Sequence, residues 1–136
     1  TERVSINRLV ARLEKRYGVI ERAKTQGKVF GDKLRKLADK HKSVGDVRGL
    51  GMFWAVEIVK DRKTKEPFGT FKDKYARKPM LVDQVTAKLL EQGVYCIGWM
   101  SHFVIAPPLI INESEMDEAV AAFDKALEIA DAQAAG

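Results

Sequence analysis

Few side chains in this sequence combine the types and the spacing that catalysis requires. The 136 residues include two histidines, His41 and His102, and one cysteine, Cys96. These three do not stand at a spacing typical of metal ligands, so we expect no metal site. A nucleophile elbow and a phosphate-binding glycine loop are also missing. We therefore expect no catalytic and no cofactor-binding residue within this chain.

One short segment brings an amphipathic aromatic residue and an imidazole close together. Residues 98–102 contain Trp99 and His102 beside Gly98. Both side chains can contact a small organic ligand through a flat face and a polar nitrogen. Trp99 and His102 are therefore the candidates for a substrate pocket. The structural alternative is a packed tryptophan and a hydrogen-bonded histidine at the tip of a hairpin, and the sequence leaves both open.

Two pairs of glycines mark places of special backbone geometry. Gly49 and Gly51 follow Arg48, but no helix begins after them, which excludes a dinucleotide-binding loop. They favour instead a sharp start or a bulge in a strand. Gly27 and Gly31 lie four residues apart within a helical pattern, where each costs about 1 kcal/mol relative to alanine. We therefore expect another backbone to approach that side of the helix closely.

The hydrophobic pattern predicts an α+β fold, in which helices flank a small and mainly antiparallel sheet. The expected helices are residues 4–17, 19–41 and 81–92, and a last one that begins at Asn112 and buries Met116, Val120, Phe123, Leu127 and Ala130. The expected strands are residues 47–59, 94–97 and 103–105. The first of these is apolar enough to be covered on both faces. Residues 60–79 form a long polar loop with Phe68, Phe71 and Tyr75 as its apolar contacts.

The net charge of +5 is unevenly distributed. Residues 1–78 contain 22 Lys and Arg against 10 Asp and Glu, whereas residues 79–136 contain 2 against 9. A basic half can bind a polyanion, but interleaved aromatic residues are missing, so nucleic acid is not the favoured partner. No apolar run reaches the roughly 20 residues of a membrane span. A single cysteine fits a reducing, cytoplasmic location.

Four segments, in order and with matching spacing, resemble the C-terminal small domain of class III aminotransferases. They are residues 19–27, 43–51, 57–61 and 106–111, the last followed by 115–119. The second contains Arg48, Gly49 and Gly51 and the fourth contains Pro107 and Pro108, which together form the signature strand and turn. The resemblance implies the small domain of a fold-type I transferase over residues 19–136. It leaves residues 1–18 as a basic N-terminal helix, divergent from the family or a junction.

This resemblance implies an enzyme that uses pyridoxal 5′-phosphate (PLP) and moves an amino group from an amine or amino acid to an α-keto acid such as pyruvate. It also implies a homodimer, and a large domain outside this chain that carries the cofactor lysine, so the chain alone is expected to be inactive. Many relatives bind the substrate carboxylate through an arginine near the strand before Ala106. Here no Lys or Arg lies between Lys88 and Lys125. Trp99 and His102 are the polar candidates in its place. Either the acid group is recognised elsewhere, or the donor is not an ordinary α-amino acid but an ω-amine, a β-amino acid or a sulfonate-bearing amine.

Two other functions fit the same residues. A stand-alone interaction module would bind a polyanion through the basic half of the chain, and this binding would weaken as salt rises. A purely structural domain without any ligand is the second alternative.

Overall fold

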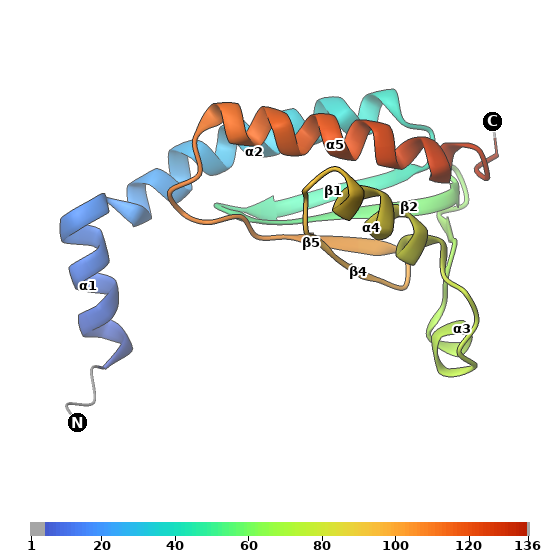
Figure 1. Ribbon diagram of the computed structural model, residues 1–136, viewed down its shortest axis with the longest axis horizontal. Helices are drawn as coiled ribbons and strands as arrows, with labels where there is room; N and C mark the ends of the chain where they lie inside the picture. The colour runs from blue at the N-terminus through green and yellow to red at the C-terminus, as the bar shows by residue number, and fades with distance from the viewer. Residues whose placement is uncertain (1–4, 136) are drawn as a thin grey trace.

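The structure, a computed structural model, describes residues 5–135. Residues 1–4 of the predicted N-terminal helix, and Gly136 at the end of the predicted domain, lie outside this range. Within it, the elements in chain order are α1 Ile6–Tyr17, α2 Val19–Lys40, β1 Val44–Leu50, β2 Phe53–Asp61, β3 Glu66–Pro67, α3 Phe71–Tyr75, α4 Leu81–Glu91, β4 Ile97–Trp99, β5 His102–Ile105 and α5 Glu113–Asp131 (Figure 1). The strand order is β1-β2-β5-β4, with β3 beside β2, and every pair is antiparallel. The predicted α+β architecture is therefore confirmed.

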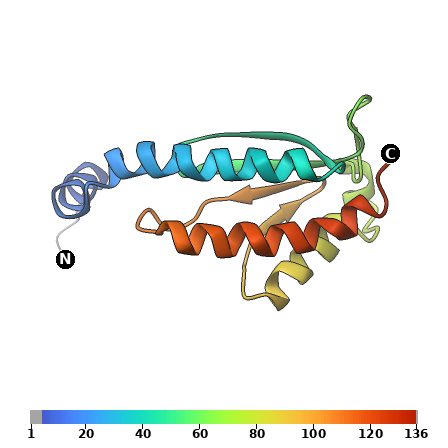
Figure 2. The same cartoon turned by 90° about the horizontal axis from the view of Figure 1, so that it is seen from above.

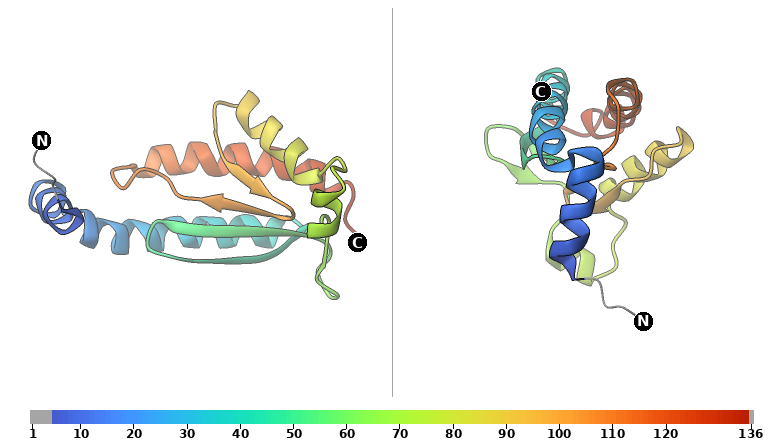
Figure 3. Two further views of the ribbon diagram at one scale, coloured as in Figure 1. Left: turned by 90° about the horizontal axis from the view of Figure 1, so that it is seen from below. Right: turned by 90° about the vertical axis from the view of Figure 1, so that its left-hand side faces the viewer.

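Three helices, α2, α4 and α5, cover one face of the sheet (Figure 1, Figure 3). Seen from above, α2 and α5 run side by side over the strands (Figure 2). Their apolar stripes meet the inward side chains of the strands in one core, which includes Phe30, Leu34, Val56, Val85, Phe103, Met116, Phe123 and Leu127. Phe103 from β5 and Phe123 from α5 pack edge to face, with ring centroids 5.7 Å apart. Removal of these side chains from water is the main force that holds the layers together.

The opposite face of the sheet is left largely exposed by residues 5–135. Leu50, Phe53 and Ile97 on this face are 88%, 63% and 55% exposed. At two ends of the molecule, α1 and α3 project past the sheet on the same side (Figure 1). We call this surface the open face; its outward residues are Asp46, Arg48, Leu50, Phe53, Ala55, Glu57, Ile97, Trp99, His102 and Val104. Contiguous exposed apolar side chains of this kind mark a surface made for contact.

The predicted N-terminal helix is present from Ile6 and ends at Gly18. Gly18 adopts φ +56°, and its N–H donates to the carbonyl of Glu14 at 2.8 Å. This left-handed residue turns the chain, so α1 leaves α2 at an angle (Figure 1). Ile6 and Leu9 from the predicted apolar stripe are 79% and 51% exposed, and α1 has no buried residue. None of the helices within residues 5–135 is long and apolar enough to cross a lipid bilayer.

The single strand predicted over residues 47–59 is wrong. The chain reverses at Gly51 and Met52, and β1 pairs with β2 so that Leu50 lies opposite Phe53. Gly51 adopts φ +58°, which a residue with a side chain rarely does and which tight hairpins require. Side chains along the first part of β2 alternate between exposed and buried, so this strand is covered on one face rather than on both. The run of apolar residues in the sequence is continuous because exposed residues at the hairpin tip, Leu50 and Phe53, are apolar as well as the residues that face the core.

The region predicted as a loop, residues 60–79, contains the end of β2, the strand β3 and the helix α3. Thr70 begins α3 with a capping box, a local signal that the sequence analysis missed. Of the three apolar contacts expected there, Phe68 packs against the core. The other two, Phe71 and Tyr75, are 68% and 84% exposed.

The second hairpin is tighter than predicted. Its turn consists of residues 100–101, and Trp99 lies directly opposite His102, so the two candidate residues belong to strands rather than to a loop of five. The hydroxyl of Ser101 is buried; it donates to the carbonyl of Gly69 at 3.0 Å and accepts from its N–H at 2.7 Å. These bonds tie the turn to the segment that leads into α3.

Helices α4 and α5 end and begin where the sequence predicts. Gly93, with φ +82°, follows α4. Asn112 and Glu115 form the expected capping box, with each side chain accepting from the other backbone N–H at 2.9 and 2.8 Å. The predicted buried side of α5 is confirmed for Met116, Phe123, Leu127 and Ala130, with Val120 partly buried.

Candidate functional site

The strand register places four side chains in one row across the open face. Asp46 lies opposite Glu57, Glu57 opposite His102, and His102 opposite Trp99. Directly opposed residues of antiparallel strands point to the same side, with Cβ atoms about 4.5–5.5 Å apart. The structure therefore brings together the two residues predicted from the sequence, and it adds two carboxylates beside them. We call Asp46, Glu57, His102 and Trp99 the polar row.

Arg48 neutralises part of this row. Its Nη1 donates to Asp46 Oδ2 at 2.6 Å and to Glu57 Oε2 at 2.7 Å. The hydrogen bonds to Glu57 and Asp46 raise the pKa of Arg48 above its ordinary value, so it stays charged. A second cation, Lys65, lines a hollow with Asp46 and Glu57, and its Nζ donates to the carbonyl of Gly45 at 2.7 Å. The contact with Arg48 also explains why Glu57 can stand within an otherwise apolar strand.

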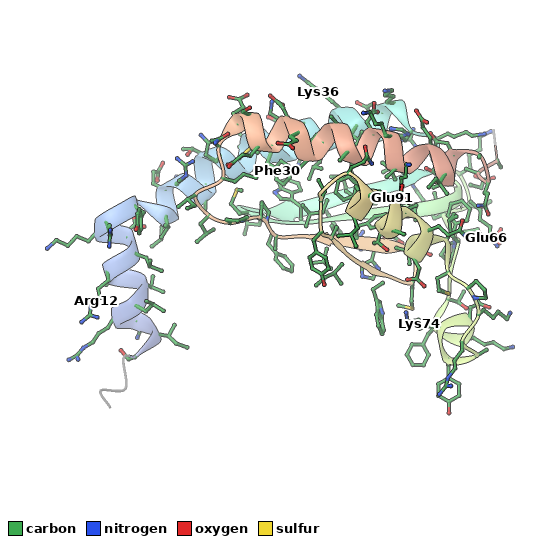
Figure 4. All side chains as sticks on the ribbon, viewed as in Figure 1. Arg12, Phe30, Lys36, Glu66, Lys74 and Glu91 are labelled. Atoms are coloured by element: carbon green, nitrogen blue, oxygen red, sulfur yellow. The ribbon has the colours of Figure 1, made fainter. Side chains whose placement is uncertain are left out.

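Trp99 stands at the end of the row nearest to α3. It is 44% exposed, and Lys74 Nζ lies 5.1 Å from the centroid of its ring, within the range of a cation–π contact. Figure 4 shows Lys74 at the side of α3 that is nearer to the sheet. A shallow pocket of about 530 Å³ opens here between the helix and the strand.

Three glycines, two on α2 and one on β1, lie at close contacts between α2 and the first hairpin. A Cβ added to Gly27 would lie 2.1 Å from the carbonyl oxygen of Gly51, and one added to Gly31 would lie 2.2 Å from the indole of Trp54. A Cβ on Gly49 would meet the same indole at 2.5 Å. Because Trp54 Nε1 also donates to the carbonyl of Gly51 at 2.8 Å, the hairpin is seated firmly on α2. The predicted close approach of another backbone is confirmed at Gly27, whereas Gly31 meets the side chain of Trp54 instead.

Pro107 and Pro108 follow β5 and border an apolar cleft of about 450 Å³, on the side of the sheet where α5 begins. Neither proline can donate to a neighbouring strand, so pairing stops there. The next three residues are fastened by Arg22, which donates to the carbonyls of residues 109, 110 and 111 at 3.1, 3.1 and 2.7 Å. The sequence gives no signal of this contact, because nearly ninety residues separate the partners.

His41 forms a buried polar cluster that the sequence did not predict. Only 2% of this residue is exposed, and its ring lies between two carboxylates, with Nδ1 2.7 Å from Asp131 and Nε2 2.9 Å from Asp124. The backbone N–H of Ser43 donates to Asp131 at 2.9 Å. This cluster lies at the C-terminal ends of α2 and α5, so it joins two helices rather than facing the polar row.

The described residues do not by themselves fit a PLP site. An internal aldimine requires a lysine that reaches into an enclosed pocket, yet strands β1, β4 and β5 contain no lysine. Lys60 on β2 is bound to Glu66 at 2.6 Å, and Lys33 on α2 is held by Glu113 and Asp117. Within residues 5–135 no three His, Cys, Asp or Glu side chains are grouped to hold a metal ion. The open face can form one wall of such a site.

The comparisons with known proteins agree on one family. The profile of the family described as Aminotransferase class-III matches residues 4–127. The chain is 34% identical over 117 residues to the taurine–pyruvate aminotransferase of Rhodobacter capsulatus, covering 81% of this chain and 24% of that protein. It is 39% identical over 99 residues to the adenosylmethionine-8-amino-7-oxononanoate aminotransferase of Methanocaldococcus jannaschii, covering 72% and 20%.

A solved structure shares the fold as well. The taurine:2-oxoglutarate aminotransferase from Bifidobacterium kashiwanohense, in complex with PLP and glutamate, superimposes with a TM-score of 0.79 at 28% identity, over 90% of this chain and 27% of that chain. The chain thus spans about a quarter of the length of the relatives that it matches. The matched segment contains the whole sheet and its covering helices, and the chain belongs to the class III aminotransferase family.

Proposed function

We propose that this chain is the C-terminal small domain of a PLP-dependent aminotransferase that moves an amino group from an amine or amino acid to an α-keto acid such as pyruvate. The observation that carries the proposal is the family match over residues 4–127, together with a sheet that has one finished core and one open face. In the proposed enzyme, the large domain outside this chain supplies the cofactor lysine, and the protein is a cytoplasmic homodimer.

The open face is the part of this chain that meets the substrate. Trp99 offers an apolar wall, and His102 offers a ring nitrogen between that wall and Glu57. The absence of Lys and Arg between Lys88 and Lys125 supports a donor other than an ordinary α-amino acid, namely an ω-amine, a β-amino acid or a sulfonate-bearing amine. The likeness to a taurine–pyruvate aminotransferase supports the last of these.

The test uses the full-length protein, loaded with PLP. We expect amino transfer to pyruvate from taurine, β-alanine or a simple primary amine, and no transfer by the 136-residue chain alone. Trp99→Ala and His102→Ala should change the ratio of kcat/KM between donors roughly tenfold, which corresponds to one lost contact in the transition state. Tyr95→Ala removes an exposed aromatic residue outside the polar row and is the matched control. A full-length protein that transfers no amino group with any of these donors refutes the proposal.

The polyanion alternative is tested with the same protein. Several basic side chains are already paired with carboxylates, including Lys33, Lys40, Arg48, Lys60 and Lys78. Because those pairs reduce the charge available to a polyanion, we expect no binding to unrelated DNA duplexes even at low salt. Tight binding that weakens steeply with salt would instead favour an interaction module.

A further inference from the structure

A pocket beside Trp99 combines cations and aromatic rings in a way that the proposed function has not used. Its lining residues are Phe71, Lys74, Tyr75, Arg77 and Trp99. Four of these come from α3 and its C-terminal turn, and the fifth is the end of the polar row. We call it the α3 pocket. Its volume of about 530 Å³ suits a small organic molecule.

The helix that builds this pocket is held rigidly at both ends, although it has only five residues. Thr70 and Asp73 form a capping box at its start, and Lys78 Nζ binds Asp73 at 2.8 Å. At its end, Arg77 donates its N–H to the carbonyl of Lys74 at 3.0 Å, and the N–H of Lys78 bonds the carbonyl of Asp73 at 3.0 Å. This double closure is the Schellman motif. The backbone that carries the side chains around the pocket is therefore held in one conformation.

Arg77 occupies the position in this motif where glycine is the usual residue. Its φ is +54°, a left-handed conformation that costs energy for a residue with a Cβ. The turn thereby keeps a guanidinium at the pocket instead of a bare backbone. Among residues 5–135, neither Lys74 nor Arg77 forms an ion pair, whereas the neighbouring Lys78 is bound to Asp73. Two positive charges therefore remain available at one end of the open face.

The cations beside Asp46 and Glu57 are already hydrogen-bonded, since Lys65 Nζ donates to the carbonyl of Gly45 at 2.7 Å. Arg48 is shared by Asp46 and Glu57, and β4 and β5 contain no Lys or Arg. An anionic group next to Glu57 would be repelled, whereas one at the α3 pocket would meet two cations in a partly apolar setting, where charge-assisted hydrogen bonds are strong. Two cations are too few for a polyanion, which makes on the order of 6–10 phosphate contacts. The chemistry fits a small acid.

We propose that the α3 pocket binds the acid group, sulfonate or carboxylate, of the amine donor, with Lys74 and Arg77 as its ligands and with the ring of Trp99 against the carbon chain. This inference rests on the proposed function, because it assigns the acid-recognition site of the same enzyme to α3. Phe71 and Tyr75 line the same pocket. The short helix α3, rather than the strands of the sheet, would then determine the specificity for an acidic donor.

The experiment compares donors in the full-length enzyme loaded with PLP. Single-turnover rates are measured without keto acid, so that no second carboxylate competes, for taurine, β-alanine and the neutral 1-aminopropane. In the double variant Lys74→Met, Arg77→Gln, the ratio of acidic to neutral donor rate constants should fall roughly 10- to 100-fold, as expected for lost hydrogen bonds to a charged group. Taurine and β-alanine distinguish a sulfonate from a carboxylate site. Lys74→Arg should preserve the ratio.

Lys72→Met is the matched control, because it removes the same charge from the same helix outside the pocket and should keep the wild-type ratio. An unchanged ratio in the double variant overturns the inference while the proposed function stands. An equal loss for all donors also overturns it, because it shows a merely structural role. If the wild-type protein transfers no amino group, the proposed function fails, and calorimetric titration with taurine then tests the α3 pocket by itself. Binding heat that the wild type shows and the double variant loses supports the inference. Equal heat in both proteins, or no heat in either, refutes the inference.

Discussion

Single residues decide how this domain responds to acid. Both ring nitrogens of His41 lie within hydrogen-bond distance of carboxylates, those of Asp131 and Asp124. The hydrogen bond from Lys40, with a smaller one from His41, lowers the pKa of Asp124. For Asp131, burial raises the pKa, but hydrogen bonds from Ser43 and His41 outweigh it, so that pKa is also lowered. A carboxyl with a lowered folded pKa stabilises the fold above its unfolded pKa and loses that contribution as the pH falls through the folded pKa.

We therefore expect the free energy of unfolding of the 136-residue chain to fall as the pH drops below about 4. In the double variant Asp124→Asn, Asp131→Asn this decrease should be smaller by about 1 kcal/mol, because two depressed carboxyl groups no longer titrate. Urea unfolding between about pH 2 and 6 measures it. Asp39→Asn, an exposed carboxyl on α2, serves as the control and should keep the wild-type slope. Equal slopes in the double variant and the wild type would contradict the interpretation.

At the scale of secondary-structure elements, α2 and the first hairpin can approach closely because the residues at their contact are glycines, which have no side chain. Two glycines of α2 face the hairpin, one against the carbonyl of Gly51 and one against the ring of Trp54. Because the hairpin sits directly on the helix backbone, its open side is held in a fixed position relative to the helices. This contact also fixes the position of the polar row, because Arg48 and Glu57 lie on β1 and β2, the two strands of the hairpin.

Gly27→Ala should destabilise the chain by about 1–3 kcal/mol, the usual cost of overpacking a close contact. In an isolated helix the same change would stabilise by about 1 kcal/mol, so the sign of the effect reports the contact. Urea unfolding measures the free energy. Thr25→Ala, on the exposed side of α2, is the control and should cost less than about 0.5 kcal/mol. A stabilised Gly27→Ala variant would show that the hairpin is not seated on α2.

Over the whole molecule, the two faces of the sheet differ in what they have to contact. One carries the core beneath three helices (Figure 1), and the other leaves Leu50 and Phe53 exposed at the tip of the first hairpin. This difference between the two faces is consistent with a chain that spans about a quarter of the length of its relatives. In the isolated chain, no other domain covers the open face. Exposed apolar side chains gathered on one face favour association between molecules.

The isolated 136-residue chain is therefore expected to bind a hydrophobic dye and to self-associate. Leu50→Thr and Phe53→Thr together should reduce both effects severalfold while changing the free energy of unfolding by less than about 0.5 kcal/mol, because these side chains are already in solvent. Sedimentation velocity and dye titration measure this. Leu90→Gln, which removes an exposed leucine of α4 that is 62% exposed, is the control and should behave as the wild type. A wild-type monomer that binds no dye would contradict an interface on the open face.

From the sequence alone, the four longer helices, the ends of α4 and α5, the α+β class and the family could be predicted, whereas α3 was missed. These follow from local or periodic signals: apolar stripes, the Asn112 capping box and the glycine after α4. The same signals misassigned the run 47–59, because a hairpin turn at Gly51 is marked by backbone conformation rather than by a break in hydrophobicity.

Only the tertiary structure decided which side chains meet. Trp99 and His102 were predicted as candidates, but their alignment with Glu57 and Asp46 depends on the register of three strand pairs, and a shift by one residue would turn each side chain to the other face. The contacts of His41 with Asp124 and of Arg22 with the carbonyl of Ile111 join residues more than eighty positions apart. Lys74 on α3 likewise meets Trp99 on β4 across a long stretch of the chain. Long-range contacts of this kind depend on packing in three dimensions, for which local sequence patterns carry no signal.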